Sequence, residues 1–104
     1  MTKDIDFVWP LLQQHQGETF YTAKGLPFTY TIRGGELFVN RRSKSITIST
    51  VANALEKIAA LEMDGIPITG PKKIGCYGAS YLYPVLLALG IFTIPDSSQN
   101  VNVI

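Results

Sequence analysis

The sequence has little of the residues that form disulfides, metal centres and histidine-based active sites. Among its 104 residues, Cys76 is the only cysteine and His15 the only histidine. One cysteine cannot form an intramolecular disulfide, and its apolar, glycine-rich surroundings suit a reducing compartment, so we expect a cytoplasmic protein. The one cysteine and the one histidine could in principle form a catalytic Cys–His pair, but the sequence shows no third residue that would orient the histidine. We therefore predict no catalytic residue, no metal site and no cofactor, and favour a non-enzymatic protein.

Long apolar stretches and an excess of one charge are also missing. The net charge is +1 and the charged fraction 16%, so any role in binding nucleic acid must depend on a local cluster of positive charge. The longest apolar run, YLYPVLLALGIF, is too short to span a bilayer and is interrupted by Pro84 and Gly90. The N-terminal stretch MTKDIDFVWPLLQQHQ has two aspartates and no continuous apolar run, so we expect it to belong to the fold rather than to a secretory signal.

What is present predicts one small soluble α+β domain over residues 1–104, with residues 92–104 as a tail. The expected order is a helix, a three-stranded antiparallel meander and then two helices. The order of helix, three strands and helix is shared with the double-stranded-RNA-binding domain. This is a topological analogy only, because no sequence motif of that family is present.

The first helix is indicated by apolar spacings of three and four over residues 5–12. Asp4 precedes this pattern as a suitable N-cap, and Gly17 lies beyond its end. Pro10 would remove a backbone hydrogen bond within the helix. We therefore expect the helix to begin near Trp9, after an irregular lead-in.

The clearest pattern is a β-hairpin. The segments LPFTYTIR and ELFVNRR both alternate and flank Gly34-Gly35, a dipeptide suited to a two-residue turn. Such a turn places Ile32 opposite Leu37 and Tyr30 opposite Val39 on the core face. The other face would carry Thr29, Thr31, Arg33, Phe38, Asn40 and Arg42. We expect the preceding ETFYTAK to be the third strand.

Two further helices follow. From Ser49 or Thr50 the apolar spacing becomes three and four, which indicates an amphipathic helix capped by one of these residues. The stretch MDGIPITGPKKIG is typical of a connection, and ASYLYPVLLALGI predicts a buried helix with Ser80 as its cap and Gly90 as its end. Three clustered tyrosines are expected to place their rings against the core edge and their hydroxyls outward: Tyr77, Tyr81 and Tyr83.

The densest positive charge lies between the hairpin and the next helix. Arg41, Arg42 and Lys44 precede the predicted helix N-terminus, where free backbone N–H groups and the helix dipole also favour an anion. Lys72 and Lys73 would extend the cluster if the helices pack side by side. The sequence therefore predicts a site for nucleic-acid phosphates formed by Arg33, Arg41, Arg42, Lys44, Lys72 and Lys73.

Other interpretations stay open at this point. Lysine and arginine on a loop and an edge strand also keep a protein soluble and prevent edge pairing. On the outer hairpin face, Phe38 would stack on a base, contact a protein partner or a second copy of the chain, or be covered by the C-terminal tail. A helix-turn-helix is less favoured because the connection between the last two helices is too long. A pocket joining His15 or Cys76 to other polar groups would instead indicate an enzyme.

Overall fold

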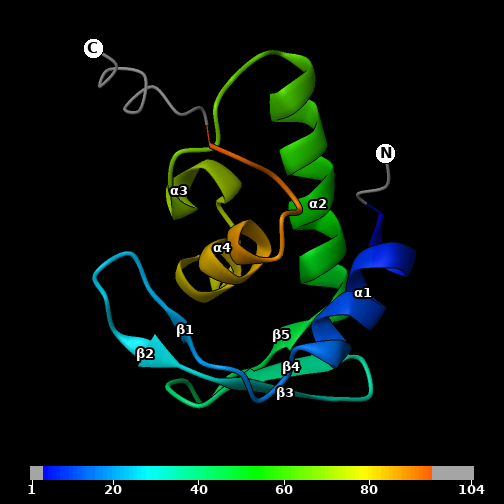
Figure 1. Ribbon diagram of the computed structural model, residues 1–104. Helices are drawn as coiled ribbons and strands as arrows, with labels where there is room; N and C mark the ends of the chain where they lie inside the picture. Colours follow the sequence, from blue (N-terminus) through cyan, green and yellow to red (C-terminus); the bar gives the residue numbers. More distant parts are fainter. Residues whose placement is uncertain (1–3, 95–104) are drawn as a thin grey trace.

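The computed structural model describes residues 4–94, and this part of the chain forms four helices and two antiparallel sheets (Figure 1). The elements in chain order are α1 (Ile5–Gln14), β1 (Phe20–Tyr21), β2 (Pro27–Phe28), β3 (Tyr30–Arg33), β4 (Glu36–Val39), β5 (Ile46–Thr47), α2 (Ile48–Met63), α3 (Pro71–Ile74) and α4 (Ala79–Ala88). Strands β1 and β2 form a ribbon, and β3, β4 and β5 form a sheet in sequential order. The predicted class is confirmed, because a helix, a three-stranded antiparallel sheet and further helices follow one another.

Helix α1 begins at its predicted cap and passes through its proline. The Phe7 N–H donates to Oδ1 of Asp4 over 3.1 Å, which confirms Asp4 as the N-cap. The expected start near Trp9 is wrong, because the helix begins at Ile5 and continues past Pro10. The proline removes one backbone hydrogen bond, but its backbone angle suits a helix, and buried apolar side chains before and after it hold α1 against the core.

The hairpin has the predicted register. Strands β3 and β4 place Tyr30 opposite Val39 and Ile32 opposite Leu37. Three of these four residues are buried and Ile32 is partly buried, so this is the core face of the sheet. Gly34 takes a φ of +60° in the turn, a conformation that residues with a side chain disfavour.

The third strand of the sheet is β5, so the assignment of ETFYTAK to this place is wrong. β5 pairs with β4, with Ile46 opposite Leu37. Within ETFYTAK, Phe20 instead pairs with Phe28 in the separate β1–β2 ribbon. The pattern in β5 could not be recognised because two residues are too short to show an alternation.

The outer edge of β3 is covered by the segment that follows α1. The Ile32 N–H donates to Oε1 of Gln16 over 2.8 Å, and the Gly17 N–H donates to the Tyr30 carbonyl over 2.9 Å. These bonds occupy backbone groups of β3 that a neighbouring strand would otherwise use. ETFYTAK therefore cannot pair along this part of the edge.

Helix α2 starts earlier than predicted. Its N-cap is Thr47, whose Oγ1 accepts the Thr50 N–H over 3.3 Å, so the expectation of Ser49 or Thr50 as the cap is wrong. The chain passes directly from β5 into α2, because the Ile48 N–H still donates to the Gly35 carbonyl over 2.8 Å. One residue thus ends the strand and caps the helix.

The chain after α2 contains a short helix, α3, within the stretch predicted to be a connection. Helix α4 has Gly78 rather than Ser80 at its N-cap position, and no side chain caps it. Gly78 has a φ of +76°, and a Cβ atom there would overlap the side chain of Ile46, so both the backbone angle and the close approach to β5 favour glycine at this position. Gly90 follows the end of α4, as predicted.

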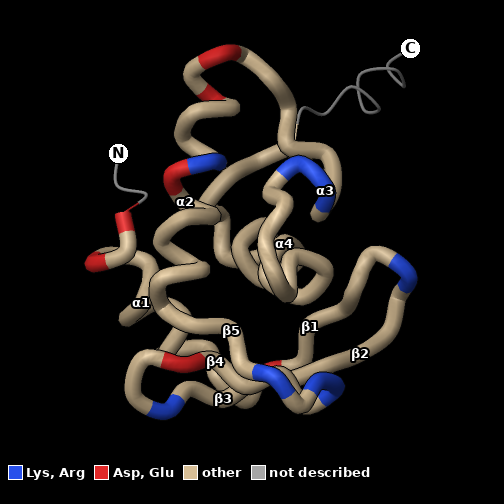
Figure 2. Tube along the Cα trace, turned by 180° about the vertical axis from the view of Figure 1, so that it is seen from behind, with Lys and Arg blue, Asp and Glu red and all other residues tan. Residues whose placement is uncertain are grey.

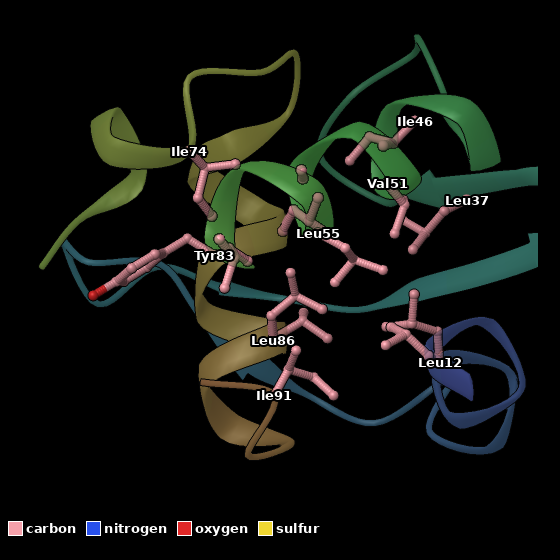
Figure 3. Close-up of a cluster of buried hydrophobic side chains, with 14 of the residues drawn as sticks. Leu12, Leu37, Ile46, Val51, Leu55, Ile74, Tyr83, Leu86 and Ile91 are labelled. Atoms are coloured by element: carbon pink, nitrogen blue, oxygen red, sulfur yellow. The ribbon is translucent and has the colours of Figure 1, made fainter. Parts of the chain in front are cut away.

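The helices lie on one face of the three-stranded sheet (Figure 1). Apolar side chains from α1, α2, α4 and the sheet converge between them, among them Leu12, Leu37 and Leu86 (Figure 3). Phe92 in the predicted tail is also buried, whereas residues 95–104 lie outside the described part of the chain. The opposite face of the sheet has no helix against it in Figure 1.

Candidate functional site

Three of the predicted site residues lie in the connection between β4 and β5, residues 40–45, which we call the basic loop. They are Arg41, Arg42 and Lys44, all exposed. The basic loop lies at one end of β4, whereas α2 begins at the other end, where Thr47 is opposite Glu36 (Figure 1). A four-residue strand of about 13 Å separates the two ends. The expected contribution of the helix N-terminus is therefore wrong, because that effect is confined to the first turn.

Both arginines of the basic loop are held in place by neighbouring elements. The Arg41 Nε donates to the Pro27 carbonyl over 2.7 Å, which ties the loop to β2. The Arg42 guanidinium carbon lies 5.6 Å from the centroid of the Tyr77 ring and 5.8 Å from that of Tyr81. Both distances are within the range of cation–π attraction, so Arg42 connects the loop to the start of α4.

Lys44 is held by the same aromatic ring. Its Nζ lies 4.5 Å from the centroid of Tyr77, and the Tyr77 hydroxyl donates to the Lys44 carbonyl over 3.1 Å. Tyr77 thus contacts two cations and the loop backbone. The shape of the basic loop depends on a residue that is 33 positions away in the sequence.

The tyrosines were recognised in the sequence as a cluster, but not as partners of the basic loop. Tyr83 is buried and its hydroxyl donates inward to the Ile68 carbonyl over 3.1 Å, so the expectation of an outward hydroxyl is wrong for this residue. Tyr81 packs edge-on against Phe28, with 5.1 Å between the ring centroids. The only signal that could have indicated a contact with Arg42 and Lys44 was the spacing of Tyr77 and Tyr81, one helical turn apart.

The positive charge of the basic loop is not neutralised by carboxylates. Within residues 4–94, no ion pair joins the loop to an aspartate or glutamate; the ion pair that occurs there joins His15 and Glu18. Glu36 contacts the loop through Ser45, whose hydroxyl donates to its Oε1 over 2.5 Å, but it forms no ion pair with Arg41, Arg42 or Lys44. An anion approaching the loop therefore meets cations with no competing carboxylate bound to them.

The other predicted basic residues do not join this cluster. Lys72 and Lys73 are exposed on α3, and Figure 2 shows the basic residues of α3 apart from the basic loop, with α4 between them in that view. Arg33 lies at the hairpin end of β3, with its guanidinium carbon 4.9 Å from the centroid of Phe38 on the outer face of the sheet. The alternation of residues along β4 predicted that Arg42 also lies on that face. Its contacts with Tyr77 and Tyr81 instead direct its side chain toward α4.

His15 and Cys76, the two residues that could have indicated catalysis, contact different parts of the molecule. His15 follows α1, and its Nδ1 lies 2.9 Å from Oε2 of Glu18. Cys76 lies before α4, in a hollow of about 360 Å³ that Asn53 and Lys57 also line. Burial raises the pKa of the Cys76 thiol, which disfavours the reactive thiolate. No group of three histidine, cysteine or acidic side chains in residues 4–94 could hold a metal ion.

A groove of about 610 Å³ between α1 and α2 lies elsewhere on the molecule. Its lining combines apolar side chains such as Leu55 with the carboxylates of Asp4 and Glu56, which would repel phosphate. The basic loop is therefore the surface whose chemistry is best suited to an anionic ligand.

Over the described residues, none of the helices has the length and apolar character needed to cross a membrane.

The geometry of the basic loop is the basis for a functional hypothesis, because similarity to other proteins supplies none. Comparison of the chain with protein-family models, with curated proteins and with solved structures finds no significant match.

Proposed function

We propose that this chain is a non-enzymatic, cytoplasmic nucleic-acid-binding protein that holds backbone phosphates on the basic loop. The proposal depends on one observation: the three cations are held in place by groups that do not neutralise their charge. Arg41, Arg42 and Lys44 are held by a carbonyl and by aromatic rings, while no described carboxylate pairs with them. Their charge is thus both oriented and available to an anion.

The way in which each side chain is held leaves hydrogen-bond donors for a phosphate. Arg41 uses Nε for the Pro27 carbonyl, and its terminal nitrogens are not involved in that bond. The Arg42 guanidinium lies over the rings of Tyr77 and Tyr81 and also interacts with their hydroxyls, but it has five N–H donors, more than these two partners use. Fixing these long side chains before binding reduces the entropy lost when a ligand binds.

The alternative proposal is a protein-interaction module or a homo-oligomer, and two observations weigh against it. The β3 edge, one surface such a module would use, is bonded to Gln16 and Gly17. The apolar helix α4, a second such surface, has four buried residues and packs into the core. Phe38 remains as the contact on which this alternative would depend.

Fluorescence anisotropy with labelled DNA and RNA, single-stranded and duplex, tests the proposal. With three phosphate contacts, the logarithm of the binding constant should fall with the logarithm of salt concentration with a slope of about −2 to −3. This corresponds to a loss of roughly 15- to 65-fold in affinity between about 50 and 200 mM salt. The double variant Arg41→Ala/Arg42→Ala should reduce the slope to about −1.

The matched control is Lys72→Ala/Lys73→Ala, which removes the same charge from α3. This variant should keep the salt slope of the wild-type protein, because its lysines lie away from the basic loop. Circular dichroism would verify that both variants are folded. Equal losses in the two double variants, or no binding by the wild-type protein at low salt, would contradict the proposal.

A further inference from the structure

Among residues 4–94, no helix lies against the outer face of the three-stranded sheet, and this face has one aromatic ring at its centre. The helices lie on the opposite side (Figure 1). Phe38 belongs to β4, the central strand, and lies opposite Thr31 of β3. It is partly exposed, although the surrounding positions on this face are polar. An aromatic side chain on an otherwise polar sheet face is a suitable surface for a flat ligand.

Positive charge flanks this ring on both sides along β4. The Arg33 guanidinium carbon lies 4.9 Å from the Phe38 centroid, at the hairpin end. The basic loop begins at the other end, and Arg41 follows Phe38 by three residues, or about 10 Å of extended chain. Glu36 is the carboxylate on this face, and it accepts the Ser45 hydroxyl. The outer face of the sheet therefore combines a stacking surface with Arg33 on one side and Arg41 beyond the other, whereas Arg42 and Lys44 contact tyrosine rings near the start of α4.

From this arrangement we infer that the ligand of the basic loop is a single-stranded nucleic acid that runs along β4 and stacks a base on Phe38. The inference rests on the proposed function, because the loop must first bind phosphates. Bases within a duplex are stacked on each other and cannot reach a ring on a sheet, whereas an unpaired base presents its flat face. The sheet face also lacks a helix that would enter a major groove.

Arg33 has a defined part in this arrangement. Its contact with Phe38 lies at the surface, and an exposed cation–π contact is weaker than stacking of a base on an aromatic ring. The base therefore displaces the guanidinium from the ring, and Arg33 then contacts the adjacent phosphate. The bound strand is held by Arg33 at one end and by the basic loop at the other.

Three probes with matched numbers of phosphates test the inference by anisotropy: a single strand, a duplex, and a strand of abasic residues. The wild-type protein should bind the single strand about 5- to 100-fold more tightly than the abasic strand, which has phosphates but no bases to stack. Phe38→Leu keeps an apolar side chain and should lose this difference. Tyr21→Leu is the control, because Tyr21 is 59% exposed on β1, in the separate ribbon.

The outcomes separate this inference from the proposed function. If the duplex and the abasic strand bind as tightly as the single strand, and Phe38→Leu has no effect, base stacking is overturned while phosphate binding stands. If the folded wild-type protein binds none of the probes at low salt, the proposed function is overturned as well. Tight single-strand binding that is lost in Phe38→Leu and salt-sensitive through Arg41 and Arg42 supports both.

Discussion

At the scale of single residues, the buried tyrosines couple the core to pH. Tyr30 is 1% exposed, and its hydroxyl donates to the Leu12 carbonyl over 2.7 Å. Burial, with a further contribution from Glu18, raises the pKa of Tyr30 far above its usual value near 10. Burial also raises the pKa of Tyr83. The folded state therefore favours the neutral form of both side chains.

This preference predicts a loss of stability in alkaline solution. A group whose pKa is raised by folding contributes its full stabilisation below its unfolded pKa, about 10 for tyrosine, and loses it as the pH rises toward the folded value. Tyr30→Phe should lower the free energy of unfolding near neutral pH by about 1 kcal/mol, through the lost hydrogen bond. Above about pH 10 the same variant should lose less stability than the wild-type protein.

Urea unfolding followed by the fluorescence of Trp9, the single tryptophan, would measure this difference between neutral and alkaline pH. Tyr21→Phe is the matched control, because its ring is 59% exposed and it should leave the pH profile unchanged. Parallel alkaline slopes for Tyr30→Phe and the wild-type protein would show that burial of Tyr30 does not contribute.

At the scale of secondary-structure elements, Thr47 joins β5 to α2. It is the last residue of β5, and its Oγ1 accepts the Thr50 N–H and lies 3.1 Å from the Thr50 hydroxyl. An N-cap side chain satisfies one of the free N–H groups in the first turn of a helix. The junction between the sheet and the longest helix therefore depends on one hydroxyl.

Thr47→Ala should lower the free energy of unfolding by about 1 kcal/mol, because the first turn of α2 loses its side-chain acceptor. Ser49→Ala tests the specificity of this effect, since Ser49 is exposed in the same turn and should change the stability by less than about 0.5 kcal/mol. Thermal unfolding of both variants would measure the difference. A larger loss in Ser49→Ala than in Thr47→Ala would contradict the assignment of the cap.

At the scale of the whole molecule, α4 contributes four buried residues to the core. Leu86 is 0% exposed, and α4 packs against α3 and β1. Through Tyr77 and Tyr81, the start of α4 also holds the basic loop. The core and the candidate site thus share one helix.

Leu86→Ala should lower the free energy of unfolding by about 2 to 5 kcal/mol, because it leaves a cavity in the core. Met63→Ala, at a residue that is 87% exposed, should change it by less than about 0.5 kcal/mol. Urea denaturation gives both values. A small effect of Leu86→Ala together with a change in oligomeric state on gel filtration would indicate instead that α4 lies between copies of the chain.

The sequence by itself determined the parts of this protein that depend on local patterns. The register of the hairpin follows from two alternating segments around a turn glycine, since a slip of one residue would expose Tyr30 and Val39. The cap of α1 and the end of α4 follow from single residues, Asp4 and Gly90, whose backbone preferences act within one turn. The positions of the charged residues along the chain could likewise be read from the sequence.

Only the tertiary structure decided which partners those elements have. A periodic pattern shows that a face is buried but not what buries it, so β5, only two residues long, and the covering of β3 by Gln16 could not be read from the chain. The same holds for the basic loop, which lies away from the N-terminus of α2 and rests on Tyr77, 33 residues after Lys44. Contacts between residues so far apart in sequence arise from the tertiary packing that brings the start of α4 beside the basic loop, and no local preference encodes them.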